Sequence, residues 1–289
     1  MHQIKTICVC GAGTMGTGIA QMSAQAGYKT ILFDLNDTII DKSKNKIDHS
    51  WARMVLKNTI TATDQQLFQQ RIIYTSIIQD CQADLIIEAI IEKASAKINL
   101  FKQLSVINSI NTIFVSNTSS ISINTIAQKL EDPLRFAGMH FFNPAPVMKL
   151  VELIQGDQTS EMVIKVLKEV CQKMNKTSVV CKDVPGFIVN RVARHYYLES
   201  LNMLEDGFTN FEAIDQVMES CGFKMGPFKL MDLIGIDINY SVSKIIWEEL
   251  GNPKRLKPSA IQEQKIVSAE LGRKTGRGFY EYPEVKSEK

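Results

Sequence analysis

The sequence predicts a doubly wound α/β domain followed by an all-α C-terminal domain. Short β-branched runs alternate with helical patterns over residues 1–183, and a glycine-rich turn follows the first of these runs. After Pro185-Gly186 the strand-like runs stop and helical periodicity continues to about Gly272. Alternating strands and helices are typical of a parallel sheet with helices on both faces. We therefore divide the chain into a first domain of residues 1–183 and a helical domain of residues 184–289.

Eight strands are expected in the first domain because apolar and β-branched residues cluster there in short runs. The first two are separated by a helix over residues 15–26 that Gly27 closes. A long helix opens at Asp37, after the second strand, and carries a periodic apolar face. The expected strands cover residues 6–10, 29–33, 71–74, 85–89, 113–115, 136–139, 150–153 and 178–181.

In the helical domain, the segment from Thr209 to Glu212 has the spacing of a capping box and predicts the start of a helix. The run from Leu230 to Ile238 is too apolar on all sides for a surface helix. It predicts a buried pair of helices or a contact between subunits. The tail from Lys286 is expected to fray.

Composition and charge exclude several classes of protein. The 289 residues are 45% hydrophobic and 22% charged, with a net charge of +2, so the chain has the composition of an ordinary globular protein. The charge balance lacks the basic excess that nucleic-acid binding needs. No apolar run approaches the roughly 18 residues of a membrane span, and no targeting signal is evident. We expect a cytoplasmic protein without a nucleic-acid or membrane partner.

The six cysteines contain no CxxC pair, so no metal site is expected. We interpret them as buried thiols in a reducing compartment. Cys8 and Cys10 are expected to lie on alternate faces of one strand and therefore not to bond to each other. The other four are Cys81, Cys171, Cys181 and Cys221.

A GxGxxG motif follows the first strand directly and opens a helix. Its first glycine permits a tight turn, its second lets the backbone approach a pyrophosphate, and its third lets the helix pack on the strand. The helix N-terminus supplies N–H donors for the phosphates. The placement predicts a Rossmann-type dinucleotide-binding domain. The motif consists of Gly11, Ala12, Gly13, Thr14, Met15 and Gly16.

Asp34 stands at the end of the second expected strand. A carboxylate at this position accepts hydrogen bonds from both ribose hydroxyls and repels a 2′-phosphate. The alternative is a turn residue ahead of the helix that begins at Asp37. With the glycine motif in place, we predict a dinucleotide site that takes NAD rather than NADP.

His140 and Glu152 form a second constellation. His140 ends an apolar strand, and on burial alone it would be a core histidine. Glu152 lies in the middle of the next strand, where a buried carboxylate is costly without a partner. The turn through Asn143 and Pro146 would return the second strand beside the first. This predicts a His–Glu dyad in which the carboxylate fixes the imidazole tautomer and the histidine acts as a base.

Polar residues also follow two other strands, at the edge where open α/β sheets bind ligands. They span Glu88 to Glu92 and Ser116 to Ser120, and the alternative is helix capping, which accounts for Ser120 or Ser122. Asn190 lies one helical turn past Gly186. It either reaches into a cleft between the domains or is an exposed amide.

With these motifs, the sequence resembles the NAD-dependent L-3-hydroxyacyl-CoA dehydrogenases, most closely the bacterial 3-hydroxybutyryl-CoA dehydrogenases. The resemblance spans essentially the whole chain and rests on seven blocks in the same order. Cys10 departs from the aliphatic residue that is usual there, which is expected to affect packing only. The blocks are GAGTMGTGIAQ from Gly11, IEAIIE from Ile87, SNTSS from Ser116, HFFNP from His140, DVPGFIVNR from Asp183, MGPFKLMD from Met225 and GRKTGRGFY from Gly272.

The resemblance implies the reversible oxidation of a (3S)-3-hydroxyacyl-CoA to a 3-oxoacyl-CoA with NAD as cofactor. It makes His140 the general base and Glu152 its orienting carboxylate. Ser119 and Asn190 would hold the hydroxyl and carbonyl oxygens of the substrate. It further implies that Asp34 binds the adenosine ribose, that Glu92, Lys97, Ser119, Asn143 and Lys274 line the nicotinamide half, and that Ser50 and Lys57 bind coenzyme A.

The resemblance also implies a homodimer built by the helical domain.

The sequence leaves two alternatives for the function. One is an NAD-dependent dehydrogenase of another 3-hydroxy acid, such as a sugar acid. The other is a non-catalytic NADH-binding protein. The acyl chain length, the physiological direction and the pathway do not follow from the sequence.

Overall fold

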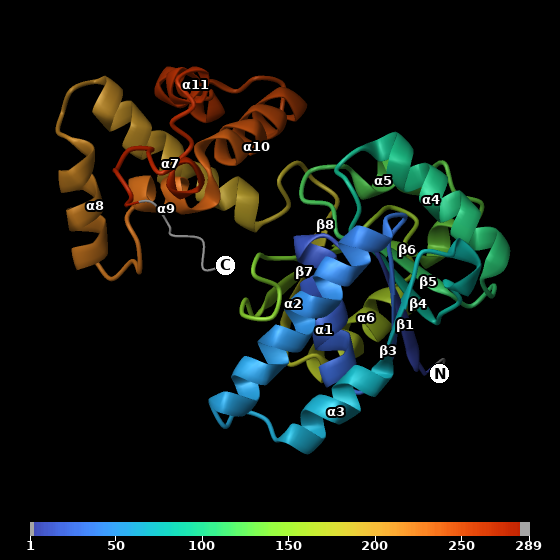
Figure 1. Ribbon diagram of the computed structural model, residues 1–289. Coiled ribbons are helices and arrows are strands. Elements are labelled where there is room, and N and C mark those ends of the chain that lie inside the picture. The colour runs from blue at the N-terminus through green and yellow to red at the C-terminus, as the bar shows by residue number, and fades with distance from the viewer. Residues whose placement is uncertain (1–2, 284–289) are drawn as a thin grey trace. The chain divides into compact units, whose positions relative to one another are not determined.

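The computed structural model describes residues 3–283, which excludes the tail from Lys286 (Figure 1). Internal contacts divide the chain into two units, Met1–Val184 and Pro185–Lys289. The division falls one residue after Asp183. In residues 3–283, no helix has both the length and the apolar character to span a membrane.

The first unit is built on one eight-stranded sheet in the order β3-β2-β1-β4-β5-β6-β7-β8. The strands pair in parallel except β7, which is antiparallel to β6. This is the doubly wound order, with β1 and β4 flanking the point where the strand order reverses. The strands are β1 (Thr6–Cys10), β2 (Lys29–Phe33), β3 (Ile72–Thr75), β4 (Leu85–Glu88), β5 (Ile113–Ser116), β6 (Phe136–Phe141), β7 (Leu150–Gln155) and β8 (Thr177–Lys182).

Helices cover both faces of this sheet, and several of them begin at a residue whose side chain caps the first turn. Asn36 caps α2 and Ser122 caps α5 through their side-chain oxygens, whereas Thr61 and Asp64 form a capping box at α3. The helices of this unit are α1 (Thr14–Gln25), α2 (Asp37–Leu56), α3 (Ala62–Arg71), α4 (Ala94–Ile107), α5 (Ile123–Ala127) and α6 (Glu161–Lys173).

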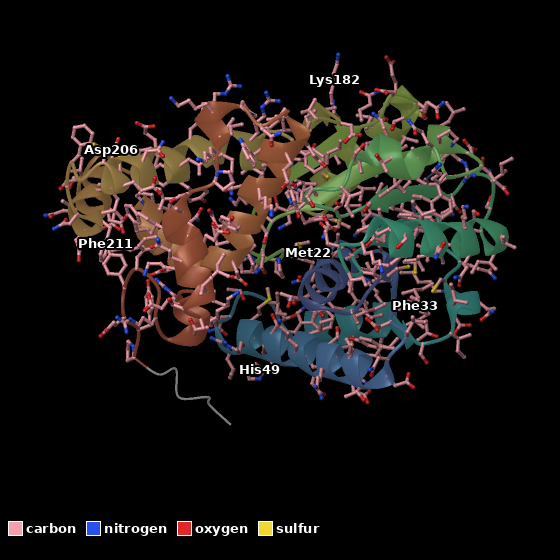
Figure 2. The ribbon with its side chains drawn as sticks, turned by 90° about the horizontal axis from the view of Figure 1, so that it is seen from above. Met22, Phe33, His49, Lys182, Asp206 and Phe211 are labelled. Atoms are coloured by element: carbon pink, nitrogen blue, oxygen red, sulfur yellow. The ribbon has the colours of Figure 1, made fainter. Side chains whose placement is uncertain are left out.

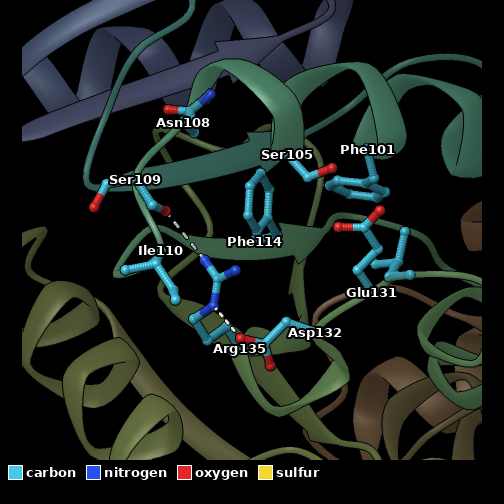
Figure 3. A pocket seen from close by; sticks show the side chains of 10 residues that line it. Phe101, Ser105, Asn108, Ser109, Ile110, Phe114, Glu131, Asp132 and Arg135 are labelled. Carbon is cyan, nitrogen blue, oxygen red and sulfur yellow. Dashed lines mark hydrogen bonds and ion pairs between the residues drawn. The ribbon is translucent and has the colours of Figure 1, made fainter.

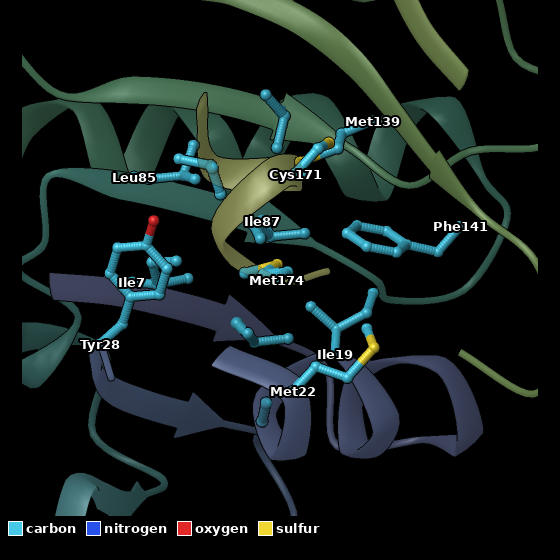
Figure 4. Close-up of a cluster of buried hydrophobic side chains, with 14 of the residues drawn as sticks. Ile7, Ile19, Met22, Tyr28, Leu85, Ile87, Met139, Phe141, Cys171 and Met174 are labelled. Atoms are coloured by element: carbon cyan, nitrogen blue, oxygen red, sulfur yellow. The ribbon is translucent and has the colours of Figure 1, made fainter. Parts of the chain in front are cut away.

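One core joins α1 and α6 to the centre of the sheet. Ile7, Ile87 and Met139 from the strands pack with Ile19 of α1 and Cys171 of α6 (Figure 4). On the opposite face, the ring of Phe101 from α4 meets Phe114 and Phe136 edge to face at centroid distances of 6.1 and 5.0 Å. A sheet buried on both faces explains why its strands are nearly continuous apolar runs.

The second unit is helical, as expected, and has its own core around Leu201, Phe228, Met231 and Ile246. The apolar run from Leu230 to Ile238 is divided between two helices, α9 and α10, which Gly235 at φ 102° separates. The run is only partly buried: Met231 and Ile236 are inside, while Leu233 and Ile238 are about half exposed. The helices are α7 (Val189–Glu205), α8 (Phe211–Ser220), α9 (Pro227–Ile234), α10 (Ile236–Glu249) and α11 (Ala260–Val267).

Two buried carboxylates organise this unit. Asp215 of α8 accepts hydrogen bonds from the backbone N–H groups of Phe228 and Lys229, at the start of α9. Asp232 of α9 accepts from the N–H groups of Phe279 and Tyr280. The sequence carries no local signal for either role, because the partner amides lie far along the chain.

The expected capping box at Thr209 is wrong. Asn210 is the N-cap of α8, and its Oδ1 accepts a hydrogen bond from Ala213 N at 2.8 Å. Asparagine and threonine both cap well, so two adjacent candidates differ only in the backbone conformation that the preceding turn imposes.

Two expectations for the cysteines are also wrong. Cys8 and Cys10 share one face of β1, with 3.8 Å between their Sγ atoms, because residues two apart in a strand point the same way. In addition, Cys221 is exposed and Cys181 is only partly buried. All six cysteines are free thiols.

Candidate active site

The three glycines of the loop after β1 serve three different purposes. Gly11 has φ +105°, and a Cβ there would lie 2.5 Å from the carbonyl oxygen of Ala89. A Cβ on Gly16 would lie 1.7 Å from the carbonyl oxygen of Gly11, so this glycine lets α1 approach the loop. A Cβ on Gly13 would meet no atom within 4 Å. Gly13 therefore borders open space, as a backbone approached by a ligand requires.

The N-terminus of α1 suits a phosphate. Gly13 is its N-cap, and no side chain caps the helix there. The first N–H groups of a helix and its dipole favour an anion at this position. The loop thus fits the pyrophosphate of a dinucleotide.

Asp34 follows β2 and is half-buried beside the glycine loop. Its Oδ2 accepts a hydrogen bond from Ala12 N at 2.8 Å, and its Oδ1 accepts from Asn36 N at 3.1 Å. The carboxylate therefore holds the loop in place. It lies beside that loop at the carboxyl end of β2, the position from which an acidic residue reaches the ribose of a bound dinucleotide.

His140 and Glu152 are brought together by the antiparallel pairing of β6 with β7, in which they are direct partners. Nδ1 of His140 lies 2.7 Å from Oε2 of Glu152. The two residues are 5% and 1% exposed, so the pair is withdrawn from water. The ring of His140 also packs against Phe142, with 4.5 Å between the ring centroids. A buried, directly paired imidazole and carboxylate can hold or transfer a proton.

Lys97 of α4 is enclosed by two carboxylates. Its Nζ lies 2.6 Å from Glu88 Oε1 and 3.1 Å from Glu92 Oε2, and the lysine is 1% exposed. The family resemblance implies roles for Lys97 and Glu92 but none for Glu88. The signal for Glu88 was its place at the carboxyl end of a buried strand, where an acidic side chain needs a cation.

The pKa values of these two carboxyl groups are shifted in opposite directions. Burial raises the pKa of Glu88, and the charge of Lys97 offsets this only in part. Burial also opposes ionisation of Glu92, but Lys97 and a hydrogen bond from Thr118 outweigh it and lower the pKa of Glu92. Glu92 therefore ionises more readily than Glu88, and part of its side chain faces solvent.

The loop after β5 is fastened to Glu92 and to the end of β6. The Oε1 atom of Glu92 accepts hydrogen bonds from the backbone N–H groups of Ser119 and Ser120 at 3.0 and 3.2 Å. Asn117 Oδ1 accepts from Phe141 N at 2.9 Å, directly beside His140 in the sequence. The residues after β1, β4 and β5 and at the end of β6 therefore gather at one edge of the sheet.

Three further residues with an expected role in binding lie in the first unit. Asn143 is exposed in the turn after β6. Ser50 follows His49, which Figure 2 labels on α2, and its Oγ accepts a hydrogen bond from Gln21. Lys57 is exposed at the C-terminal end of α2.

Two expected residues belong to the second unit. Asn190 lies in the first turn of α7 and is partly buried. The Nζ atom of Lys274 lies 2.5 and 2.7 Å from the carboxylate oxygens of Asp237.

A cavity of about 280 Å³ lies elsewhere in the first unit, between α4 and the amino-terminal ends of β5 and β6 (Figure 3). Arg135 in its wall is paired with Asp132 at 2.7 Å and bonded to the carbonyl oxygen of Thr112. The cavity opens at the opposite ends of the strands from His140, so it is separate from the candidate active site.

The fold and the glycine loop define a Rossmann-type NAD-binding protein with a helical second domain. The family model described as the 3-hydroxyacyl-CoA dehydrogenase NAD binding domain matches residues 6–184, and that of the C-terminal domain matches residues 186–282. The chain belongs to the 3-hydroxyacyl-CoA dehydrogenase family.

Individual relatives agree with this assignment. The chain is 38% identical over 276 residues to a probable 3-hydroxybutyryl-CoA dehydrogenase of Deinococcus radiodurans, covering 95% of this chain and 99% of the relative. It is 39% identical over 284 residues to the 3-hydroxyadipyl-CoA dehydrogenase of Escherichia coli, covering 98% of this chain but only 60% of that longer protein.

A solved structure gives the same result. The (S)-3-hydroxybutyryl-CoA dehydrogenase of Ralstonia eutropha superposes with a TM-score of 0.94 at 36% identity, covering 97% of this chain and all of the other. The predicted family, fold class, NAD cofactor and enzyme class are confirmed by these comparisons and by the sheet order.

Proposed function

We propose that the chain catalyses the reversible, NAD-dependent oxidation of a (3S)-3-hydroxyacyl-CoA to the 3-oxoacyl-CoA with His140 as general base. The observation that carries the proposal is the buried contact of 2.7 Å between His140 Nδ1 and Glu152 Oε2. Glu152 keeps the proton on Nδ1, which makes Nε2 the nitrogen that takes the hydroxyl proton of the substrate. When bound, NAD supplies the acceptor for the hydride from C3. The carboxylate then stabilises the imidazolium that forms.

The glycine loop from Gly11 to Gly16 is proposed to bind the pyrophosphate, and Asp34 the adenosine ribose. Glu92 is proposed to face the nicotinamide half, with Lys97 as the residue that positions it. The two contacts of Lys97, to Glu88 and to Glu92, support a positioning role because its ammonium group is withdrawn from solvent. Ser119, Asn143 and Lys274 complete the proposed cofactor set.

For the substrate, we propose that Ser119 and Asn190 hold the reacting oxygens, and that Ser50 and Lys57 bind coenzyme A. Ser50 lies within α2 and Lys57 is the C-cap of that helix, about two helical turns further along. This spacing supports a shared face for the two side chains. A short acyl chain is favoured because two proteins that match this chain over nearly their full length, those of Deinococcus radiodurans and Ralstonia eutropha, carry the name 3-hydroxybutyryl-CoA dehydrogenase.

We further propose that the protein is a cytoplasmic homodimer. Six free thiols favour a reducing compartment. Leu233 and Ile238 are 48% and 50% exposed on adjacent helices of the second unit, and exposed apolar side chains of this kind favour an interface.

The oxidation of NADH with acetoacetyl-CoA tests the proposed activity. Turnover with this thioester, and little with the free acid or with 3-oxo sugar acids, is the expected result. No turnover with any of these substrates would indicate a non-catalytic NADH-binding protein. For chain length, a clear preference for 3-oxooctanoyl-CoA would refute the short-chain proposal and leave the dehydrogenase proposal intact, because each buried methylene adds about 0.8 kcal/mol only where the pocket accepts it.

A further inference from the structure

Three cysteines from two distant segments converge in the interior of the first unit. Cys8 and Cys10 lie on β1, and Cys81 directly follows the short helix η1 (Ile78–Asp80). Their Sγ atoms all lie within 4.8 Å of one another, and those of Cys8 and Cys10 are 3.8 Å apart. All three residues are 0% exposed. A single buried cysteine usually acts as a small apolar side chain, but three sulfurs within 4.8 Å of one another form a ligand set.

The third sulfur is held in place by its own backbone. The Nδ2 atom of Asn108, at the end of α4, donates to the carbonyl oxygen of Cys81 at 2.8 Å. Cys81 N in turn donates to the carbonyl oxygen of Ile78 at 3.0 Å. Because β1 is also paired on both sides in the sheet, all three ligands sit on fixed backbone. A site of this kind requires little rearrangement to bind an ion.

The walls of the cluster are largely apolar. The cross-strand partners of Cys8 are Ile31 and Ile86, and those of Cys10 are Phe33 and Glu88. The carboxylate of Glu88 is already engaged by Lys97. Such surroundings exclude water. They therefore favour an ion that is bound by sulfur alone over an ion that keeps a hydration shell.

We propose that Cys8, Cys10 and Cys81 form a binding site for a soft, thiophilic metal ion that takes three sulfur ligands, with Cu(I) as the ion of that class. A metal–sulfur bond of about 2.3 Å places three planar ligands about 4 Å from one another. The observed 3.8 Å between the sulfurs of Cys8 and Cys10 is close to this value, and all three sulfurs lie within 4.8 Å of one another. Thiolates select soft ions, and Zn²⁺ requires a fourth ligand. Among residues 3–283, no histidine, aspartate or glutamate side chain joins the three cysteines in this cluster.

Binding joins β1 to the segment after η1. The thiols that coordinate the ion release their protons, so loading is accompanied by proton release. Cys10 immediately precedes Gly11, the first residue of the dinucleotide loop, and the ion therefore stiffens the base of that loop. An ion that binds only the folded chain also raises its thermal stability.

The test is an anaerobic titration of the reduced full-length chain with Cu(I) against the coloured chelator bicinchoninate. We expect one Cu(I) per chain, with a Tm above that of the metal-free protein. Cys81→Ser and Cys8→Ser should each weaken binding at least tenfold. Cys221→Ser, at the exposed cysteine, and Cys171→Ser, at a buried cysteine outside the cluster, should leave it unchanged. Zn²⁺ at the same concentration should not displace the ion.

A measurement on the unaltered protein guards against variants that fail to fold. X-ray absorption at the copper edge should show three sulfur neighbours and no nitrogen. The proposal is overturned by failure to compete with the chelator, by a coordination sphere that contains nitrogen or fewer than three sulfurs, or by loss of binding in Cys221→Ser rather than in folded Cys81→Ser.

Discussion

Asp34 accepts a hydrogen bond from the backbone N–H of Ala12 through Oδ2, at 2.8 Å. The end of β2 and the glycine loop are thus joined by a charged acceptor, and a charge-assisted bond of this kind is stronger than a neutral one. An ionised carboxylate offers about four acceptor positions, so Asp34 retains capacity for the ribose hydroxyls. One side chain therefore both shapes the loop and discriminates between cofactors.

Replacing Asp34 tests both roles. Asp34→Ser should lower the preference of the enzyme for NAD over NADP, because the negative charge that repels a 2′-phosphate is gone. It should also lower Tm, since the bond to Ala12 is lost. Ratios of kcat/KM for the two cofactors and thermal unfolding check the two effects, with the exposed Asp37→Ser as control. Equal use of NADP by the unaltered enzyme would contradict the assignment.

An added methyl group is expected to affect NADH binding at one glycine of the loop and thermal stability at another. Gly13→Ala should leave Tm nearly unchanged, because its Cβ meets no atom within 4 Å, and should weaken NADH binding at least about tenfold by filling the space of the pyrophosphate. Gly16→Ala should lower Tm, since its Cβ would lie 1.7 Å from the Gly11 carbonyl oxygen. NADH fluorescence titration and calorimetry measure the effects. Unchanged NADH affinity in folded Gly13→Ala would rule out this binding mode.

Glu92 predicts a specific dependence of stability on pH. Lys97 and Thr118 overcome the effect of burial and lower the pKa of Glu92 in the folded chain. Its contribution to stability is therefore complete above the ordinary value of 4.5 and is lost as the pH falls through the lower folded value. The Tm gap between the unaltered protein and Glu92→Gln should be large at neutral pH and close in acid. The exposed Glu131→Gln is the control, and a gap that grows in acid would refute the assignment.

Association of two chains is expected to depend on the apolar face of the second unit. Leu233→Glu places a charge on a side chain that is 48% exposed, and it should convert the proposed dimer to monomer. Val267→Glu, at a position 82% exposed in the same unit, should not. Light scattering at micromolar concentration distinguishes the two. A monomeric unaltered protein would exclude the proposed dimer.

The sequence predicted what depends on local pattern. Strand and helix alternation placed the sheet, and Glu152 in mid-strand signalled a buried partner because its cost is visible without coordinates. Contacts between distant segments were not accessible in this way. The hydrogen bonds that Asp215 and Asp232 accept from distant backbone N–H groups, the enclosure of Lys97 by Glu88, and the approach of Cys81 to β1 all depend on where the chain returns. The error at Cys8 and Cys10 differs in kind, because their spacing of two already requires a shared face.

The turnover of His140→Gln tests the central claim most directly, with NADH affinity measured on the same preparation. Glutamine keeps the size and polarity of the side chain but cannot accept the proton, so kcat should fall by ~100-fold or more while the affinity for NADH stays nearly constant. Glu152→Gln should reproduce much of this loss. A His140→Gln enzyme with near-normal turnover would show that another residue is the base, and would contradict the account.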